Sequence, residues 1–521
     1  MIDGSILIGS RTLRVSSTFK AVNPATGEML PGDFSEASAE QVAEACALAA
    51  AAAPEFGAFA LDRRADFLEC AADAILKIGD ILIETAISET GLPRPRLEGE
   101  RMRTVNQLRL FAGEVRKGEF LDATIDPAMP DRAPPRSDLR RMNLPVGPIA
   151  VFGASNFPLA FSVAGGDTAS AFAAGCPVVV KGHPAHPGTG ELVARAIGEA
   201  VAACGLPEGV FSYLPGRSNE LGAALVSDPR IKAVGFTGSR SGGLALVDIA
   251  AKRPEPIPVY AEMSSINPVV LLPAALSARA EALGEAFVAS LTLGSGQFCT
   301  NPGLVIAIEG PDLDRFIAAA AASLATIEPA VMLTPGIHTA FVRGVEVLDN
   351  RAKRIATGAA APSANSCSGA IFAASAAEFA ADAVLSEEIF GASSLIVRCR
   401  DQDEMARVIE GLEGQLTASL HLDPADEEAA ARVLPMLQEK VGRVLANGWP
   451  TGVEVTWAMV HGGPFPATSD GRTTSVGTLA MSRFLRPVCY QDLPEALLPP
   501  ALKTANPWGL PRRVDGKREP V

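Results

Sequence analysis

Cys299 lies in a turn whose composition suits a reactive thiol. The sequence GSGQFCTNPG places glycines at 294 and 296 before the cysteine and Pro302 and Gly303 after it, between a helical stretch and an apolar strand. A thiol in such a turn can be partly exposed and near backbone N–H groups, conditions that lower its pKa and make it a nucleophile. A buried structural cysteine is the alternative, and the local sequence alone does not separate the two.

Two more polar residues follow apolar strands. Asn156, in GASNFPLAF, offers a neutral amide donor that could stabilise a developing oxyanion without protonating it. Glu262, in VYAEMSS, ends an apolar strand, and a carboxylate among apolar neighbours can have a raised pKa and act as a general base. For each residue, a capping or surface role is the default alternative.

Two segments could hold a nucleotide. VGFTGSRSGG places Gly238, Ser239 and Gly243 at a strand-to-helix turn, where bare backbone and a helix N-terminus can approach a pyrophosphate. In CPVVVKGHP, Lys181 leaves the carboxyl end of an apolar strand, where it could bind ribose hydroxyls or a phosphate. Because the turn is not a GxGxxG fingerprint, a plain tight turn is the alternative for the glycine segment. For Lys181 the alternative is a solvated lysine after a strand.

Alternating strands and helices must position these residues. The 521 residues, 48% of them hydrophobic and 5% aromatic, predict an α/β protein of two or three domains. Because strands and helices alternate after residue 144, a parallel, doubly wound sheet is expected. The helical patterns cover 39–53, 61–78, 80–88, 93–118, 168–174, 188–204 and 220–226, and the apolar strands lie within 146–155, 176–182, 209–216, 231–239 and 258–273.

The same pattern divides the chain into three regions. Residues 1–273 are expected to form a Rossmann-type dinucleotide-binding domain with N-terminal helices and an arm near 126–144. Residues 274–441 form a second α/β domain, which carries Cys299. Residues 442–521, rich in Gly, Pro and Thr, are expected to return to the first domain and the arm.

Composition argues against several kinds of partner. A formal net charge of −14 would repel nucleic acid and an anionic membrane face. No apolar stretch is long enough to span a membrane, and we expect a cytoplasmic protein. Eight scattered cysteines show no disulfide or zinc spacing. No histidine pair adjoins a carboxylate in the sequence, which predicts no metal site, and His183 and His186 are expected at a turn or surface.

Six motifs in order resemble the aldehyde dehydrogenase superfamily: SNFPL, PVVVK, GFTGS, the glutamate of YAEMSS, GQFCT and EEIFG. The similarity runs from about residue 20 to about residue 490. It implies an NAD(P)-dependent enzyme that oxidises an aldehyde through a cysteine thioester. It also implies a Rossmann-type domain, a second catalytic domain, and an oligomerisation arm whose strands subunits exchange, so a homodimer or homotetramer is expected.

The resemblance implies a role for each matching residue. Cys299 is the expected nucleophile, Glu262 the general base that activates water, and Asn156 the oxyanion donor beside the backbone N–H of Cys299. The expected cofactor ligands are Lys181 at the adenosine ribose, Ser239 with Gly238 and Gly243 at the pyrophosphate, and Glu388 and Phe390 at the nicotinamide ribose and ring.

Departures from the common family pattern narrow the prediction. Many family members have Leu-Gly-Gly after the glutamate, where this chain has Met263 to Ser265, and Pro-Ser-Glu after the lysine, where it has Gly182 to Pro184. With these two departures the chain resembles the branch of bacterial 2,5-dioxopentanoate dehydrogenases and NADP-linked fatty aldehyde dehydrogenases. NAD-preferring relatives often place a carboxylate where Pro184 stands. Its absence favours NADP over NAD, and Arg217 could pair with the 2′-phosphate, unless it is a solvated turn arginine.

Arg103 suggests the substrate. Register with the family through LRLFAG places it on the helix that lines the aldehyde tunnel, with Phe157, Phe161 and Phe298 beside it. Its guanidinium could bind the distal carboxylate of 2,5-dioxopentanoate, which the enzyme would oxidise to 2-oxoglutarate. Alternatively, Arg103 faces solvent or pairs with Glu98 or Glu100, and the substrate is a medium- or long-chain aldehyde.

Three rival functions are weighed against this prediction. A CoA-acylating enzyme would transfer the thioester to CoA, but that branch generally lacks a carboxylate where Glu262 stands. A non-catalytic binding protein on the same fold is disfavoured because every chemical position is occupied. A metal-dependent hydrolase is weaker still, since the five histidines include no HExxH motif.

Overall fold

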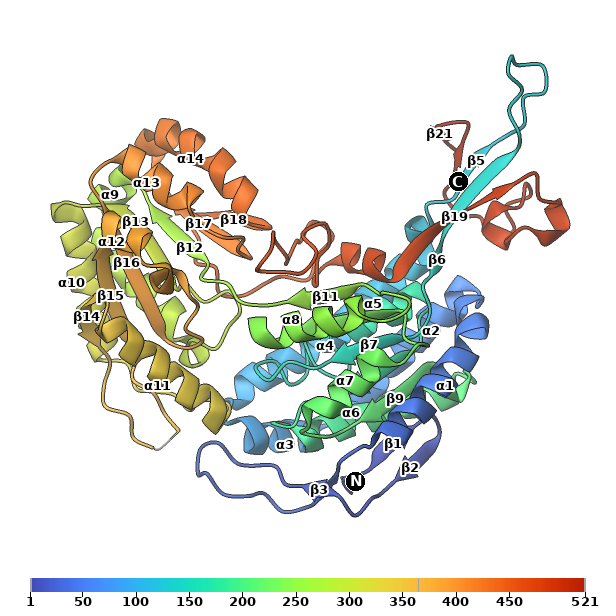
Figure 1. Cartoon of the computed structure of the whole chain (residues 1–521), viewed down its shortest axis with the longest axis horizontal. Coiled ribbons are helices and arrows are strands. Elements are labelled where there is room, and N and C mark those ends of the chain that lie inside the picture. Colours follow the sequence, from blue (N-terminus) through green and yellow to red (C-terminus); the bar gives the residue numbers. More distant parts are fainter. Residues whose placement is uncertain (1, 364, 520–521) are drawn as a thin grey trace.

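The protein consists of two α/β lobes and a projecting sheet, which we call the arm (Figure 1). The computed structural model describes residues 2–363 and 365–519. The α/β class and the helices predicted within the first 118 residues are confirmed, with ends within a few residues of those expected. No helix of these described ranges is both long and apolar enough to cross a bilayer.

The first lobe is built on a seven-stranded sheet of order β11-β10-β7-β8-β9-β1-β2. Five strands are parallel, and the order reverses between β7 and β10, which makes their carboxyl ends a switch point for ligand binding. The parallel pairing predicted for the strands after residue 144 is confirmed, and the N-terminal hairpin adds two strands with antiparallel pairing at one edge. The strands are β1 (Ile6–Ile8), β2 (Arg11–Leu13), β7 (Ile149–Phe152), β8 (Val178–Lys181), β9 (Phe211–Leu214), β10 (Ala233–Thr237) and β11 (Val259–Glu262).

Helices cover both faces of this sheet because its strands are apolar on both sides. Val151 and Val180 point into one core, and their neighbours Ala150 and Val179 point into the other. The first core is closed by α2 (Leu61–Lys77), α3 (Asp80–Thr90), α4 (Arg94–Lys117), α5 (Gly166–Ala174) and α6 (Pro187–Ala203), and the second by α1 (Ala39–Gly57), α7 (Asn219–Ser227) and α8 (Arg240–Ala251).

The second lobe has a sheet of order β14-β15-β16-β13-β12-β17-β18, parallel except for β14. One face packs on α9 (Pro273–Thr292) and α10 (Pro311–Ala325), and the other on α11 (Pro335–Asp349), α12 (Ala376–Ala381), α13 (Gln402–Glu410) and α14 (Glu427–Lys440). The strands are β12 (Pro268–Leu271), β13 (Leu304–Ile308), β14 (Lys353–Thr357), β15 (Ala370–Ser375), β16 (Ser393–Cys399), β17 (Thr417–His421) and β18 (Arg443–Ala446).

The strand predicted over 258–273 is two strands in different sheets. β11 ends at Glu262 in the first sheet, and β12 begins at Pro268 in the second. Between them Asn267 adopts a positive φ of 48°, which turns the chain. Both strands are apolar, so hydrophobicity alone did not reveal the break. The chain thus passes between the sheets at 263–267, ahead of the expected boundary at 273.

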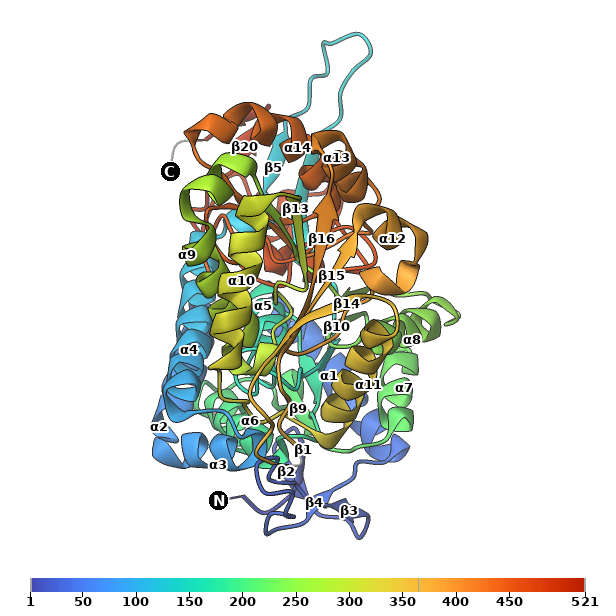
Figure 2. The ribbon, with the colours of Figure 1, turned by 90° about the vertical axis from the view of Figure 1, so that its left-hand side faces the viewer.

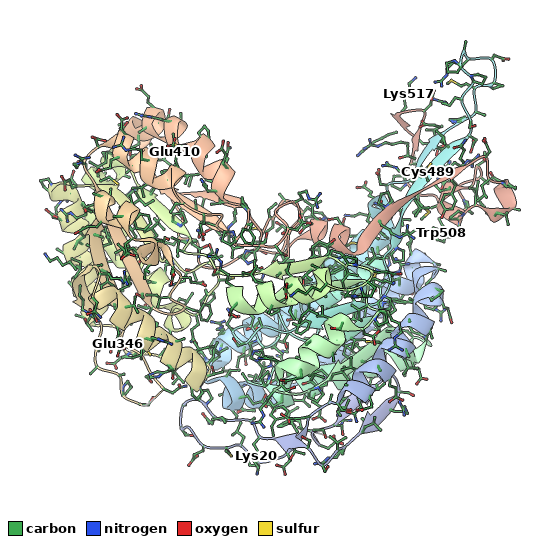
Figure 3. The ribbon with its side chains drawn as sticks, in the orientation of Figure 1. Lys20, Glu346, Glu410, Cys489, Trp508 and Lys517 are labelled. Carbon is green, nitrogen blue, oxygen red and sulfur yellow. The ribbon has the colours of Figure 1, made fainter. Side chains whose placement is uncertain are left out.

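The arm is a five-stranded sheet of order β19-β6-β5-β20-β21. β19 pairs antiparallel with β6 along seven residues, which joins the end of the chain to the segment before the first lobe's central strand. Figures 1 and 2 show the loop at 127–138 projecting beyond both lobes, and Figure 3 labels Cys489 and Lys517 on the arm. The strands are β5 (Thr124–Asp126), β6 (Leu139–Pro145), β19 (Leu485–Gln491), β20 (Arg513–Val514) and β21 (Lys517–Arg518).

Candidate active site

The Cys299 loop is held in place from two sides. It follows α9, and residues 294, 295 and 296 all have positive φ (56°, 60° and 69°). A Cβ on Gly296 would lie 2.3 Å from the carbonyl carbon of Gly391, so the chain passes where only glycine fits. Asn267 donates from Nδ2 to the carbonyls of Cys299 and Asn301, both at 2.9 Å. The turn that separates the two sheets therefore also fixes the thiol.

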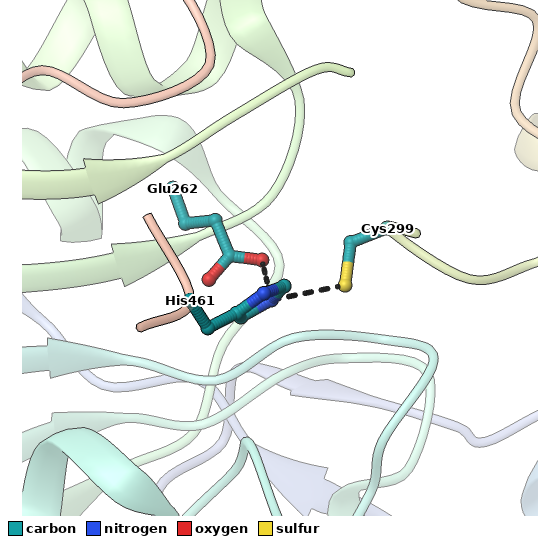
Figure 4. Close-up of side chains that lie close together, drawn as sticks. All are labelled: Glu262, Cys299 and His461. Atoms are coloured by element: carbon teal, nitrogen blue, oxygen red, sulfur yellow. Dashed lines mark hydrogen bonds and ion pairs between the residues drawn. The ribbon is translucent and has the colours of Figure 1, made fainter. Parts of the chain in front are cut away.

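Glu262, Cys299 and His461 meet in a cluster in which Glu262 and His461 are buried and Cys299 is partly exposed (Figure 4). His461 Nε2 lies 3.3 Å from Cys299 Sγ and 2.9 Å from Glu262 Oε1. The hydroxyl of Ser475 donates to Glu262 Oε2 at 2.5 Å, and Glu262 is 3% exposed. One imidazole nitrogen thus faces both a thiol and a carboxylate.

The pKa shifts in this cluster run opposite to those expected from the sequence. Burial acts to raise the pKa of Glu262, but His461 and hydrogen bonds from Ser475 and Cys299 outweigh it and hold that pKa below its usual value. Burial, with the nearby charge of Glu262, raises the pKa of the Cys299 thiol well above its usual value. The resting site therefore pairs an ionised carboxylate with a protonated thiol, and the thiol needs a proton acceptor.

His461 is the functional residue that sequence reasoning missed. No histidine pair adjoins a carboxylate in the sequence, but the fold places His461 beside Glu262, because it joins a segment after β18 to the end of β11. The three side chains offer N, O and S atoms within 4.8 Å of one another, a donor set that zinc accepts. A zinc ion bound there would use the thiol as a ligand, so the thiol could not attack an aldehyde.

His186, expected at a turn or surface, is also buried, with Nε2 3.0 Å from the carbonyl of Ala154.

Asn156 lies next to the cysteine loop, as the oxyanion role requires. Its Nδ2 donates to the carbonyl of Gln297 at 3.1 Å, and Arg96 donates to its backbone carbonyl at 2.7 Å. Within the described chain, no residue accepts a hydrogen bond from the backbone N–H of Cys299. An amide side chain and a free backbone N–H are thus both available beside Sγ.

The three predicted phenylalanines form one aromatic wall. Phe157 lies 5.5 Å from Phe298 and 5.2 Å from Phe161 between ring centroids, and Phe161 lies 6.4 Å from the ring of His461. The wall therefore reaches the catalytic cluster. Such a surface can exclude water from a bound aldehyde.

Arg103 is partly buried against Phe161, the same ring of the wall that faces His461. Its guanidinium lies 5.4 Å from the Phe161 ring and donates to the carbonyl of Val453 at 2.7 Å. Its Nε and Nη2 are buried without a partner in the described chain, and burial lowers the pKa of the group. Among the described residues no ion pair joins Arg103 to Glu98 or Glu100, although Glu100 acts electrostatically on its guanidinium: Glu98 pairs with Arg94, and Glu100 accepts from the backbone N–H groups at 159 and 160.

Glu388 and Phe390 lie on the other side of the cysteine loop. They line a small hollow together with Ser265, Phe298 and Asn301. Burial raises the pKa of Glu388 to about 8, although a backbone hydrogen bond with Ser265 opposes the shift. A largely protonated carboxyl here could donate as well as accept hydrogen bonds.

The remaining predicted cofactor ligands lie at the carboxyl ends of the first sheet. Ser239 caps α8, since its Oγ accepts from the N–H of Gly242 at 3.2 Å. Lys181 ends β8, and burial lowers its pKa to about 8 against the opposing charge of Glu36. A Cβ on Gly238 or Gly243 would clash with Phe236 or Met263 at 2.7 or 2.8 Å, so both glycines are needed for packing whether or not a phosphate approaches.

Arg217 is exposed but does not stand alone. Its Nε lies 3.0 Å from Oε1 of Glu36, a residue from the N-terminal segment. The sequence has no carboxylate at position 184, and this absence favoured NADP. The fold brings the carboxylate of Glu36 to this region from a distant part of the sequence, so the absence at position 184 no longer favours NADP.

Comparisons with known proteins agree with this geometry. The model of the aldehyde dehydrogenase family matches residues 13–475. Alpha-ketoglutaric semialdehyde dehydrogenase 2 of Azospirillum brasilense is 58% identical over 99% of this chain and 100% of its own. Alpha-ketoglutaric semialdehyde dehydrogenase of Acinetobacter baylyi is 46% identical over 98% and 97%. The structure of 1-pyrroline-5-carboxylate dehydrogenase from Thermus with bound NAD shares the fold, with a TM-score of 0.81 and 20% identity over 93% and 92% of the two chains.

The charge of Glu262 predicts how fast Cys299 is alkylated at each pH. Glu262→Gln removes a like charge that raises the thiol pKa, so the midpoint of the pH profile for alkylation by iodoacetamide should move to lower pH. The rate is followed by peptide mass spectrometry without cofactor, and the exposed Cys489 on the arm is the internal control. An unchanged or higher midpoint for Cys299 would contradict this electrostatic account.

Proposed function

Because the chain belongs to the aldehyde dehydrogenase family, we propose that it oxidises 2,5-dioxopentanoate, the α-ketoglutaric semialdehyde, to 2-oxoglutarate with NADP or NAD. The family match bears out the resemblance drawn from the six motifs. Two relatives named for this substrate support the assignment along nearly the whole chain. The observation that carries it is the buried guanidinium of Arg103, with two unpartnered donor nitrogens.

His461 starts the reaction by taking the proton of the thiol. His461 reacts in the neutral tautomer that carries its proton on Nδ1, which leaves the lone pair of Nε2 free. As Sγ of Cys299 bonds to the aldehyde carbon, the S–H proton passes to Nε2, 3.3 Å away. The carboxylate of Glu262 stabilises the imidazolium that forms. The aldehyde oxygen becomes an oxyanion, which the amide of Asn156 and the backbone N–H of Cys299 stabilise.

The residues at the carboxyl ends of the first sheet fit a dinucleotide. Lys181 would bind the adenosine ribose, the N-terminus of α8 with Ser239 the pyrophosphate, and Glu388 with Phe390 the nicotinamide riboside. The buried cation of Lys181 and the exposed helix N-terminus are the features that suit such an anion. When bound, the nicotinamide would accept the hydride from the tetrahedral carbon.

Glu262 then serves the second half of the reaction. Once the acyl group is on sulfur, the ionised carboxylate takes a proton from water as its oxygen attacks the thioester carbon, and the thiol leaves as the acid is released. Ser475 holds Oε2, which leaves Oε1 on the side of Cys299 and His461. A carboxylate at this place favours hydrolysis over transfer to CoA.

Arg103 gives the site its preference among aldehydes. A carboxylate at the far end of a short chain would satisfy the unpartnered Nε and Nη2 and place the aldehyde carbon along the aromatic wall toward Cys299. An aliphatic aldehyde would contact the same phenylalanines but leave these donors unsatisfied. This wall is the observation that favours a medium- or long-chain aldehyde as the second candidate substrate.

The arm favours a homodimer or homotetramer. β19 is an edge strand of seven residues, long enough to pair with another chain, and the arm projects away from the first lobe (Figure 1). Burial of the arm against a second copy would cover this edge.

Substitution of Arg103 tests the substrate assignment. Arg103→Met should lower kcat/KM for 2,5-dioxopentanoate about 10–100-fold, the order expected from a lost charged hydrogen bond. The value for hexanal should change less than about threefold, since no charge is lost from its contacts. Arg109→Met on the same helix is the control, because Arg109 is exposed and pairs with Asp73. If hexanal is the better substrate of the parent, or if both substrates slow equally, the proposal fails.

The oligomer is tested by light scattering of the purified chain at micromolar concentration. A mass of two or four chains is expected because the edge of β19 would then be covered. A monomeric mass would contradict the proposed role of the arm.

A further inference from the structure

An ion pair joins the N-terminal segment to the end of the first sheet beside Lys181. β3 (Thr18–Phe19) and β4 (Phe34–Ser35) form a small separate sheet, and Glu36 follows β4 directly. The N–H of Ala37 donates to the carbonyl of Pro215 at 2.9 Å, which fixes Glu36 next to the turn after β9. The sheet register places the ends of β8 and β9 side by side, with Lys181 opposite Leu214.

Each carboxylate oxygen of Glu36 has one partner, and the side chain remains partly exposed. Its Oε1 lies 3.0 Å from Arg217 Nε, and its Oε2 accepts from Ser17 Oγ at 3.2 Å. The Glu36 side chain is 24% exposed and that of Arg217 is 61% exposed, with its guanidinium 5.6 Å from the Phe19 ring. Glu36 also acts electrostatically on the ammonium of Lys181. One carboxylate therefore faces the two cations proposed for the adenosine end of the cofactor.

We propose that Glu36 sets the balance between NAD and NADP. Its carboxylate accepts a hydrogen bond from the 2′-hydroxyl of the adenosine ribose, as acidic residues do in dinucleotide sites. The same charge repels a 2′-phosphate and neutralises Arg217, which would otherwise attract it. This inference rests on the proposed dinucleotide chemistry.

Binding measurements on the whole protein test this role without turnover. Dissociation constants for NAD and NADP are measured by calorimetry for the parent, Glu36→Gln and Arg217→Ala. Glu36→Gln should tighten NADP and weaken NAD, with the ratio of the two constants shifting about tenfold, as expected for one charge removed near a phosphate. Glu36→Asp, which keeps the charge, should shift the ratio less.

A second comparison separates Glu36 from Arg217. Arg217→Ala should weaken NADP more in the Glu36→Gln background than in the parent, because Glu36 no longer neutralises the guanidinium. Glu44→Gln is the matched control, since Glu44 forms an exposed ion pair with Arg11 of the edge strand β2 instead of with Arg217.

The outcomes distinguish this inference from the proposed function. An unchanged NAD/NADP ratio in Glu36→Gln, or an equal loss of both cofactors, overturns the role of Glu36 while the dinucleotide site stands. A parent protein that binds neither cofactor overturns both.

Discussion

The site depends on one nitrogen, Nε2 of His461, which lies between a partly exposed thiol and a buried carboxylate. A carboxylate that is 3% exposed would normally become protonated, because burial disfavours its charge. His461 and Ser475 keep Glu262 ionised, and Glu262 in turn raises the pKa of the thiol. The protonation of Glu262 therefore depends on its neighbours, and that of Cys299 depends on Glu262.

The rest of the fold brings these groups together. Glu262 ends an edge strand of the first sheet, Cys299 follows a helix of the second lobe, and His461 comes from the segment that returns toward the arm. Asn267 links the first two, because it turns the chain between the sheets and also binds the carbonyl of Cys299. The site thus exists only when both lobes and the C-terminal segment are packed.

The sequence revealed the motif residues but not the contacts among them. Cys299, Glu262 and Asn156 lie in segments with recognisable composition and order, so they could be proposed before the structure. His461 and Glu36 lie in segments with no local signal, and only the tertiary fold brings them to the site. The pKa directions of Glu262 and Cys299 differed from those expected because local sequence does not show tertiary partners: His461 and Ser475 oppose the effect of burial on Glu262, and the charge of Glu262 adds to the effect of burial on Cys299. The break between β11 and β12 was missed because both strands are apolar.

The account divides the reaction between two residues: His461 accepts the thiol proton, and Glu262 serves hydrolysis. Stopped-flow measurement of reduced cofactor in the first turnover, with Glu262→Gln and His461→Asn compared with the parent, tests this division directly. Glu262→Gln should give a burst of one equivalent within about tenfold of the parent rate and then stall, whereas His461→Asn should slow the burst by about 100-fold or more. A parent-like burst in His461→Asn, or steady turnover by Glu262→Gln, would contradict it.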